Sequence, residues 1–361
     1  MNILIAILVF GIVVLVHEIG HFVAARACGV LVEEFSIGMG PRLLKFKRGE
    51  TLYSLRLFPI GGSCQMLGED EENHDERSFN SKKIWKRAVI LSAGVLMNLL
   101  LAFLAFLVYT SANPFNVPVV RYVIPNSPAA AAGMQAGDRI TKMNGHAINI
   151  QADSFLAMDG NHGEPIEVQF MRDGEKYAMT MTPILVINEK TEAKEYKIGV
   201  NWDARLGVFY RDAELEALAS RATIGETVAT AFHNVSFSLK ATIQGLGKLI
   251  TFKANPEELA GPIGIVSMVG DIQTEAVEEG GISLAVWSLI NFMALLSANI
   301  GLFNLLPFPA LDGGRLVFLV IEKIRRKPIP PEKEGMVHLA GLALLLVLAV
   351  FVAYNDILKL L

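Results

Sequence analysis

Residues 3–27 read ILIAILVFGIVVLVHEIGHFVAARA, an apolar segment that carries a His-Glu-x-x-His motif in its second half. On a helix, residues four apart share a face, so His17 and His21 can bind one Zn²⁺ while Glu18 stands beside the metal-bound water. Ionisable side chains at such a depth in a membrane are costly and by default mark function. We therefore predict a metal site here and not a chance match.

The composition is that of a membrane protein. Of the 361 residues, 52% are hydrophobic and 19% are charged, and the mean hydropathy is +0.42. A soluble domain has about a quarter charged residues. The formal net charge of −4 gives no reason to expect nucleic acid as a partner. Two cysteines, Cys28 and Cys64, are too few for a disulfide framework and are expected to be free thiols.

Four segments are long and apolar enough to cross about 30 Å of hydrocarbon. They are residues 3–27, 88–110, 282–306 and 336–354. Lysine and arginine are concentrated in the loop after the first segment and in the loop before the fourth. The positive-inside rule makes both loops cytoplasmic, so both termini and the stretch between the second and third segments are expected to be extracytoplasmic.

Residues 117–203 are expected to form a small α/β domain. Ser127 is a good N-cap and Pro128 suits the first position of a short helix. Asn-Gly at 144–145 and Asp-Gly at 173–174 are hairpin signals. The run SPAAAAGMQAGDRITKMNG at 127–145 closely resembles a PDZ domain, which implies a groove that binds peptide ends by strand addition. The alternative is a spacer that binds nothing.

Two further regions flank the predicted membrane helices. Residues 33–62 alternate polar and apolar side chains around Gly49, which predicts a β-hairpin that dips towards the membrane. Residues 214–253 are amphipathic. That stretch either lies on the outer membrane surface or packs on the α/β domain.

A third metal ligand is needed, because catalytic zinc takes three protein ligands and keeps one position open for water. The end of the third apolar segment, NLLPFPALDGG at 304–314, supplies one. Pro307 and Pro309 break the helix and leave Asp312 near membrane depth, where coordination of zinc with the two histidines would offset the cost of burial. The alternative is that Asp312 only caps a helix that begins at Gly313.

The motifs HEIGH, GPIGI at 261–265 and NLLPFPALDGGR at 304–315, with the PDZ-like insert, resemble the site-2 protease family, and within it the RseP-like bacterial branch with a single PDZ domain. The resemblance implies Zn²⁺ bound by His17, His21 and Asp312, with Glu18 as the general base. It also implies substrate-binding roles for Asn304 and Pro307, and for Asn98, although Gly94 is followed here by valine where the family often has proline. The implied substrates are single-pass membrane proteins, such as anti-sigma factors or signal-peptide remnants, in the bacterial cytoplasmic (inner) membrane.

A membrane helix resists hydrolysis because its carbonyls are hydrogen-bonded internally, so a substrate must unwind locally. We expect strand 51–57 of the hairpin to hold the unwound substrate as an added strand, with Thr51, Ser54 and Leu55 in contact with it. The PDZ-like domain is expected to bind peptide C-termini or other extracytoplasmic segments.

The predicted fold class is therefore a polytopic α-helical membrane protein with four transmembrane helices, a cytoplasmic-side β-hairpin and an extracytoplasmic α/β PDZ-like domain. The expected sections are membrane helices at 1–28, 84–112, 282–308 and 335–358, the hairpin loop at 29–83, the PDZ-like domain at 117–203, an amphipathic or interfacial region at 210–281 and a cytoplasmic loop at 309–334.

Two other functions compete with proteolysis. One is a catalytically silent PDZ membrane adaptor, which has no need of a buried base such as Glu18. The other is a zinc transporter, for which four spans with one metal site make a poor permeation path. Metal-dependent flux into liposomes would separate a transporter from a protease.

Overall fold

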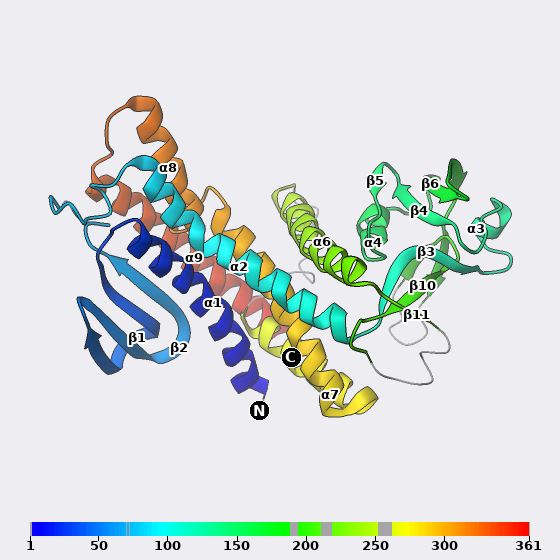
Figure 1. The fold of residues 1–361 in the computed structure, drawn as a ribbon, viewed down its shortest axis with the longest axis horizontal. Coiled ribbons are helices and arrows are strands. Elements are labelled where there is room, and N and C mark those ends of the chain that lie inside the picture. Colours follow the sequence, from blue (N-terminus) through cyan, green and yellow to red (C-terminus); the bar gives the residue numbers. More distant parts are fainter. Residues whose placement is uncertain are drawn as a thin grey trace. The chain divides into compact units, whose positions relative to one another are not determined.

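The structure, a computed structural model, describes residues 2–69, 71, 73–187, 194–210, 219–251 and 262–360. It divides into two units, which we call the helical unit (Met1–Ala105 with Ser238–Leu361) and the sheet unit (Phe106–Phe237). The long helices are α1 (Asn2–Ala27), α2 (Ile84–Ala112), α6 (Ile224–Ile250), α7 (Pro262–Leu305), α8 (Asp312–Arg325) and α9 (Pro331–Leu360) (Figure 1).

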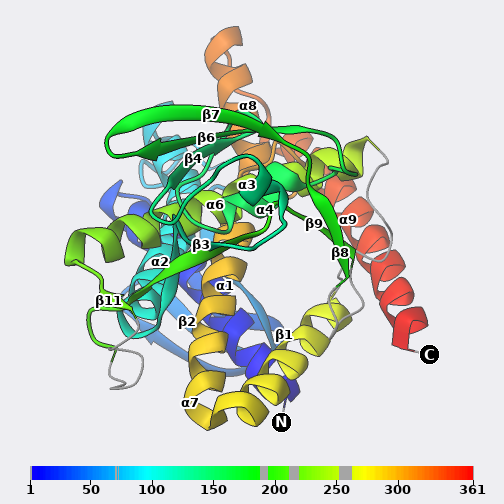
Figure 2. The same cartoon turned by 90° about the vertical axis from the view of Figure 1, so that its right-hand side faces the viewer.

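The four predicted spans are confirmed as helices long and apolar enough to cross a membrane. Within the described part of the chain they are Leu4–Ala27, Ile84–Ala112, Gly281–Leu305 and Glu332–Tyr354. α7 is longer than its span because a further helical stretch precedes it, and the two meet at Gly281 with φ 70° and ψ −167° (Figure 2). Of the predicted region 210–281, residues 211–218 and 252–261 lie outside the described residues, including the first glycine of the GPIGI motif.

The predicted hairpin is confirmed as β1 (Val32–Arg48) and β2 (Thr51–Met66), which lie beside α1 (Figure 1). Its strands fold back on themselves, so residues 35–37 pair with 53–55 on one side and with 62–64 on the other. Residues 53–55 also pair with 44–46. A substrate strand therefore has no free edge to bind at 53–55, the middle of the segment 51–57 for which strand addition is predicted.

Glu34 is a buried carboxylate inside this hairpin, only 3% exposed. It accepts hydrogen bonds from Arg42, from Arg56 (2.9 Å) and from the Ser54 hydroxyl (2.6 Å). The Arg42 guanidinium, followed by the other two donors, lowers the pKa of Glu34 to about 2. The charged form is thus the one that the folded hairpin favours.

We expect Glu34→Gln to destabilise the hairpin by about 1.5–3 kcal/mol near neutral pH, the usual contribution of hydrogen bonds to a charged group. Because the folded pKa lies below the unfolded value, this stabilisation is complete above pH about 4.5 and is lost as the pH falls towards 2. The measurement is the difference in unfolding free energy between wild type and variant, in detergent, across that range. Glu50→Gln is the control, since that carboxylate is exposed, and an equal pH-dependent difference there would contradict the assignment.

The sheet unit has a sheet in the strand order β11-β10-β3-β4-β6-β7, with β5 paired to β4, and a separate β8-β9 pair. Its elements are β3 (Phe115–Val123), α3 (Pro128–Ala131), β4 (Arg139–Met143), β5 (His146–Ala147), α4 (Asp153–Met158), β6 (Ile166–Arg172), β7 (Glu175–Met181), β8 (Ile184–Ile187), β9 (Lys194–Lys197), β10 (Val200–Leu206) and β11 (Ser220–Arg221). The α/β composition is as predicted.

Local signals in this unit are confirmed. The Ser127 hydroxyl accepts a hydrogen bond from the Ala130 backbone N–H and so caps α3. The turns at 144–145 and 173–174 have positive φ at both residues. The first joins β4 to β5, and the second joins β6 to β7 (Figure 2). The core between sheet and helices includes Ile140, Ile166, Val168 and Phe170, all fully buried. The PDZ-like identity and the membrane orientation stay predictions.

Candidate active site

Both histidines of the motif lie on the face of α1 that meets α2, as their spacing requires. The two helices approach closely at Gly20, where an added Cβ would lie 2.5 Å from the backbone oxygen of Ala93. His17 and His21 are buried and their Nε2 atoms are 3.1 Å apart. Both rings therefore present the same nitrogen to one point inside the helical unit.

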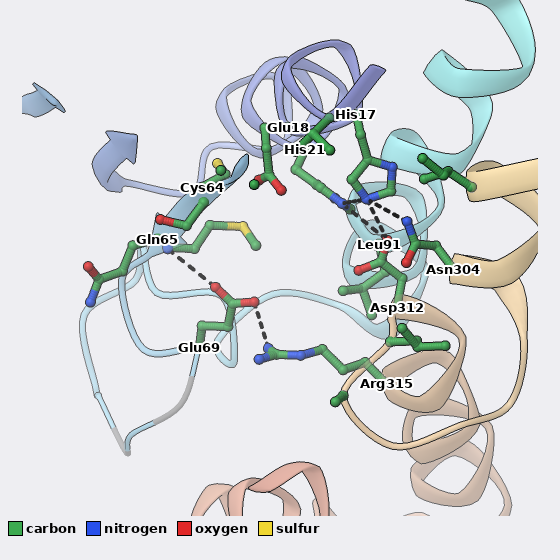
Figure 3. A pocket seen from close by; sticks show the side chains of 18 residues that line it. His17, Glu18, His21, Cys64, Gln65, Glu69, Leu91, Asn304, Asp312 and Arg315 are labelled. Carbon is green, nitrogen blue, oxygen red and sulfur yellow. Dashed lines mark hydrogen bonds and ion pairs between the residues drawn. The ribbon is translucent and has the colours of Figure 1, made fainter. Parts of the chain in front are cut away.

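Asp312 completes the cluster from the other end of the sequence (Figure 3). Its Oδ2 lies 3.1 Å from His17 Nε2 and 3.2 Å from His21 Nε2. The N-cap residue of α8 is Leu311, and no side chain caps this helix. The alternative role of Asp312 as a helix cap is therefore wrong, because its carboxylate turns to the histidines.

The loop between α7 and α8 places Asp312 by close backbone packing. An added Cβ at Gly314 would lie 2.3 Å from the backbone oxygen of Phe308, so only glycine fits there. Ala310 has a φ of 76°, and its N–H donates to His338 Nδ1 over 2.8 Å. His338 on α9 thus binds the loop and is not part of the metal-ligand cluster.

The three ligand atoms fit Zn²⁺. Four-coordinate zinc with bonds of about 2.0–2.1 Å sets its ligand atoms about 3.3 Å apart, and the observed separations are 3.1, 3.1 and 3.2 Å. Asp312 Oδ2 is buried without a hydrogen-bond partner, which is unfavourable unless a cation accepts its lone pair. Among the residues that the structure describes, these three form the group able to hold a metal ion.

The ring nitrogens that face away from the cluster contact α2. His21 Nδ1 lies 2.9 Å from the backbone oxygen of Ile90 and donates to it, which leaves Nε2 free to bind a metal. His17 Nδ1 lies 3.4 Å from the side-chain nitrogen of Asn98. Asn98 is fully buried. The structure therefore places this predicted substrate-binding residue behind a metal ligand.

Glu18 lies next to the ligands and faces the hairpin (Figure 3). An added Cβ at Gly62 would lie 3.0 Å from Glu18 Cγ. Glu18 and Cys64 of β2 line the same cavity. Glu18 is not a member of the ligand cluster, so its carboxylate is free to exchange a proton with water.

A cavity of about 580 Å³ joins Glu18 to the ligand cluster. α1, β2 and the segment from the end of α7 to α8 form its walls. Asn304 lines it, with its side-chain nitrogen 3.5 Å from His17 Nε2. Its contact with substrate stays a prediction. Pro307 is exposed and is not one of the described residues that line the cavity. Its predicted role in substrate binding therefore stays a prediction.

The other predicted substrate contacts lie within the hairpin. The Thr51 hydroxyl donates to the backbone oxygen of Val32, and that of Ser54 donates to Glu34. Both side chains are buried, whereas Leu55 is partly exposed. None of these predicted contacts lines the cavity.

One ion pair at the cavity was not predicted from the sequence. Arg315 of α8 donates to Glu69 Oε1 over 2.6 Å, and the Met66 backbone N–H donates to Glu69 Oε2 over 3.3 Å. Glu69 so connects the end of β2 to the helix that carries Asp312 (Figure 3). Glu69 is the first residue of an acidic run, and nothing in that run except its charge indicates a partner.

Comparison with known proteins agrees with this geometry. The family model of peptidase family M50 matches residues 5–348. A putative zinc metalloprotease of Clostridium perfringens is 35% identical over 99% of this chain and 98% of its own. The regulator of sigma-W protease RasP of Bacillus subtilis is 32% identical over 98% of this chain and 97% of its own.

A zinc metalloprotease RasP of Bacillus licheniformis is likewise 32% identical over the full length of both chains. Each match spans the ligand cluster, the hairpin and the sheet unit together. The ligand geometry and the whole-length family match agree on a zinc cofactor and on peptide hydrolysis, which excludes the silent adaptor. The chain belongs to peptidase family M50 and is a membrane-spanning zinc metalloprotease.

Proposed function

We propose that this enzyme performs intramembrane proteolysis, cutting single-pass membrane proteins within or beside the bilayer. The observation that carries the proposal is the metal-ligand cluster of His17, His21 and Asp312, with Glu18 adjacent, because two of its ligands and the base belong to a helix apolar enough to span a membrane. Such a site has access to peptide bonds that soluble proteases do not reach.

The chemistry assigns a separate task to each side chain. Zinc held by the three ligands supplies a Lewis acid that activates water and polarises a carbonyl. Glu18 accepts the proton of the attacking water and passes it to the amine nitrogen that leaves. Asn304, on the cavity wall beside His17, hydrogen-bonds the unwound substrate backbone. The polar side chains that line the cavity suit the water that this reaction consumes and that the hydrocarbon region lacks.

Residues 61–66 of β2 are the better candidate for strand addition. They line the cavity, and within the described part of the chain the strand partners of 62–66 all belong to β1. The Met66 backbone N–H donates to the Glu69 carboxylate, and Gly62 lies against Glu18, since an added Cβ there would be 3.0 Å from Glu18 Cγ. Because alternate backbone groups of a strand point the same way, a substrate strand at this edge would run directly past Glu18.

Disulfide crosslinking tests this edge. With both natural cysteines replaced by serine in a Glu18→Gln background, a cysteine at Gln65 should crosslink to every second position of a single-cysteine series along the substrate's unwound segment. The matched control is a cysteine at Lys47, which is likewise exposed and lies on the opposite edge of the hairpin, and which should give no such pattern. Crosslinks without a two-residue period, or equal at both edges, would exclude strand addition at 61–66.

The substrates and orientation follow as parts of the same proposal. One relative is named as the regulator of sigma-W protease RasP, and this name supports anti-sigma factors as one class of substrate. Signal-peptide remnants are the second class. The positive-inside rule supports a bacterial inner membrane protein whose hairpin is cytoplasmic and whose sheet unit and both termini are extracytoplasmic. The sheet unit, as a PDZ-like domain, would bind peptide C-termini or extracytoplasmic segments of the substrate.

Comparative proteomics of membrane fragments tests the function. Cells that carry the Glu18→Gln enzyme should accumulate single-pass fragments that wild-type cells clear, and these fragments name the substrates. Identical fragment profiles in the two strains would count against intramembrane cleavage.

A further inference from the structure

The two zinc-ligating histidines are not held in the same way, and the difference points to Asn98. A histidine that binds zinc through Nε2 carries its proton on Nδ1, and a buried N–H needs an acceptor. His21 has one in the backbone oxygen of Ile90. For His17, the group next to Nδ1 is the amide of Asn98.

The Asn98 amide has an unused acceptor at this position. Its Oδ1 is buried and has no hydrogen-bond partner, while its Nδ2 lies 3.4 Å from His17 Nδ1. Once His17 binds zinc through Nε2, two N–H donors would face each other. A half-turn about the Cβ–Cγ bond of Asn98 exchanges oxygen and nitrogen, because the two ends of an amide have nearly the same shape. That rotation pairs the unused oxygen with the Nδ1 proton.

We propose that Asn98 is a positioning residue of the zinc centre, whose Oδ1 accepts the hydrogen bond from His17 Nδ1–H and fixes the tautomer and ring orientation of His17. This replaces the substrate contact that the sequence predicted for Asn98. With 0% of its surface exposed, the residue has no access to a substrate in the cavity.

α7 holds Asn98 in place from the other side. The Ser297 hydroxyl donates to the Asn98 backbone oxygen over 2.8 Å. An added Cβ at Gly301 would lie 3.2 Å from Asn98 Cβ, so the two helices are in close contact there. The same helix carries Asn304, the amide on the cavity side of His17. The two asparagines therefore have different roles: Asn98 lies on the side of His17 away from the cavity, and Asn304 lies on the cavity side.

The test measures zinc binding, independent of turnover. Full-length Asn98→Leu and Asn98→Asp variants are purified in detergent, and the Kd for zinc is measured by competition with a chelator. Asn98→Leu removes the acceptor and should weaken zinc binding by about 10–100-fold. Asn98→Asp keeps an acceptor and should bind zinc at least as tightly as wild type. At saturating zinc, the KM for a reporter substrate should be unchanged in the aspartate variant.

Thr110→Val is the matched control on the same helix. Thr110 is a buried polar residue whose hydroxyl donates to the backbone oxygen of Phe106, so its loss perturbs α2 without touching the zinc centre. Zinc affinity should not change. If Asn98→Leu does not fold, the Asn98→Asp variant decides alone, because ionised aspartate accepts hydrogen bonds and cannot donate them. Weakened zinc binding in Asn98→Asp would show that the amide acts as a donor, and would overturn the proposal. A raised KM with unchanged zinc affinity in either variant would restore the substrate role and also overturn it.

Discussion

Replacement of Glu18 by glutamine is expected to slow peptide cleavage by about 10²–10⁴-fold, the usual contribution of a general acid–base group. Glutamine has the shape of glutamate and fits the space between the ligand cluster and Gly62. It does not accept a proton from water at neutral pH. Since Glu18 is not one of the three ligands, the variant should keep one zinc ion per chain. Cleavage of a purified single-pass substrate and the zinc content of the same preparation are the two measurements.

Asp312→Asn separates the base from the ligand. Asparagine keeps the size of aspartate but loses the charge that the two neutral histidines need to hold a dication, so this variant should lose zinc together with cleavage. Retained zinc in Glu18→Gln and lost zinc in Asp312→Asn would establish the two roles. Turnover that persists in purified Glu18→Gln would require a different proton acceptor and would remove Glu18 from the mechanism.

The ligand cluster could be predicted because helix geometry and ligand number constrain it strongly. A spacing of four residues leaves His17 and His21 no choice of face once the segment is helical. The need for a third ligand then selects the carboxylate next to the broken helix, 291 positions beyond His21 in the sequence. Hydropathy alone gave the four spans, since a helix in hydrocarbon must satisfy its own backbone.

The pairing of the hairpin strands, in contrast, could not be predicted from the sequence. Alternation predicted strands and the turn at Gly49, but the register of a strand depends on pairings that local sequence does not specify. Here 53–55 pairs on both sides and 62–64 is left at the edge. The assignment of the substrate-binding edge therefore required the structure. The ion pair between Glu69 and Arg315 was out of reach for the same reason, because it joins segments whose proximity only the fold creates.

Gly94 is a second residue whose role only the structure reveals. Its place on α2 lies directly against both histidines: an added Cβ would lie 2.4 Å from His21 Nε2, 2.6 Å from His17 Cε1 and 2.8 Å from His17 Nε2. These distances are far below van der Waals contact. A single methyl group at this position would therefore occupy the space that the two imidazoles need in order to bind zinc.

Gly94→Ala is accordingly expected to weaken zinc binding, and cleavage with it, while the fold survives. Overpacking costs about 1–3 kcal/mol, and the gain of alanine over glycine in a helix offsets about 1 kcal/mol of it. The imidazole rings of His17 and His21 must therefore move. A shift of His21 breaks its hydrogen bond to the backbone oxygen of Ile90, which fixes the tautomer of the ring. We expect zinc affinity to fall by 10–100-fold or more, measured by chelator competition, with little change in thermal unfolding of the zinc-free protein.

Gly335→Ala on α9 is the matched control, because no heavy atom lies within 4 Å of a Cβ added there. That substitution should stabilise its helix by up to about 1 kcal/mol and leave zinc binding and cleavage unchanged. Normal zinc affinity in Gly94→Ala would mean that α1 and α2 separate to admit the methyl group. The close approach of Gly20 to Ala93 opposes such a separation, since the same helix contact would have to open along with it. A tightly bound zinc in this variant would thus contradict the helix packing on which the ligand geometry depends.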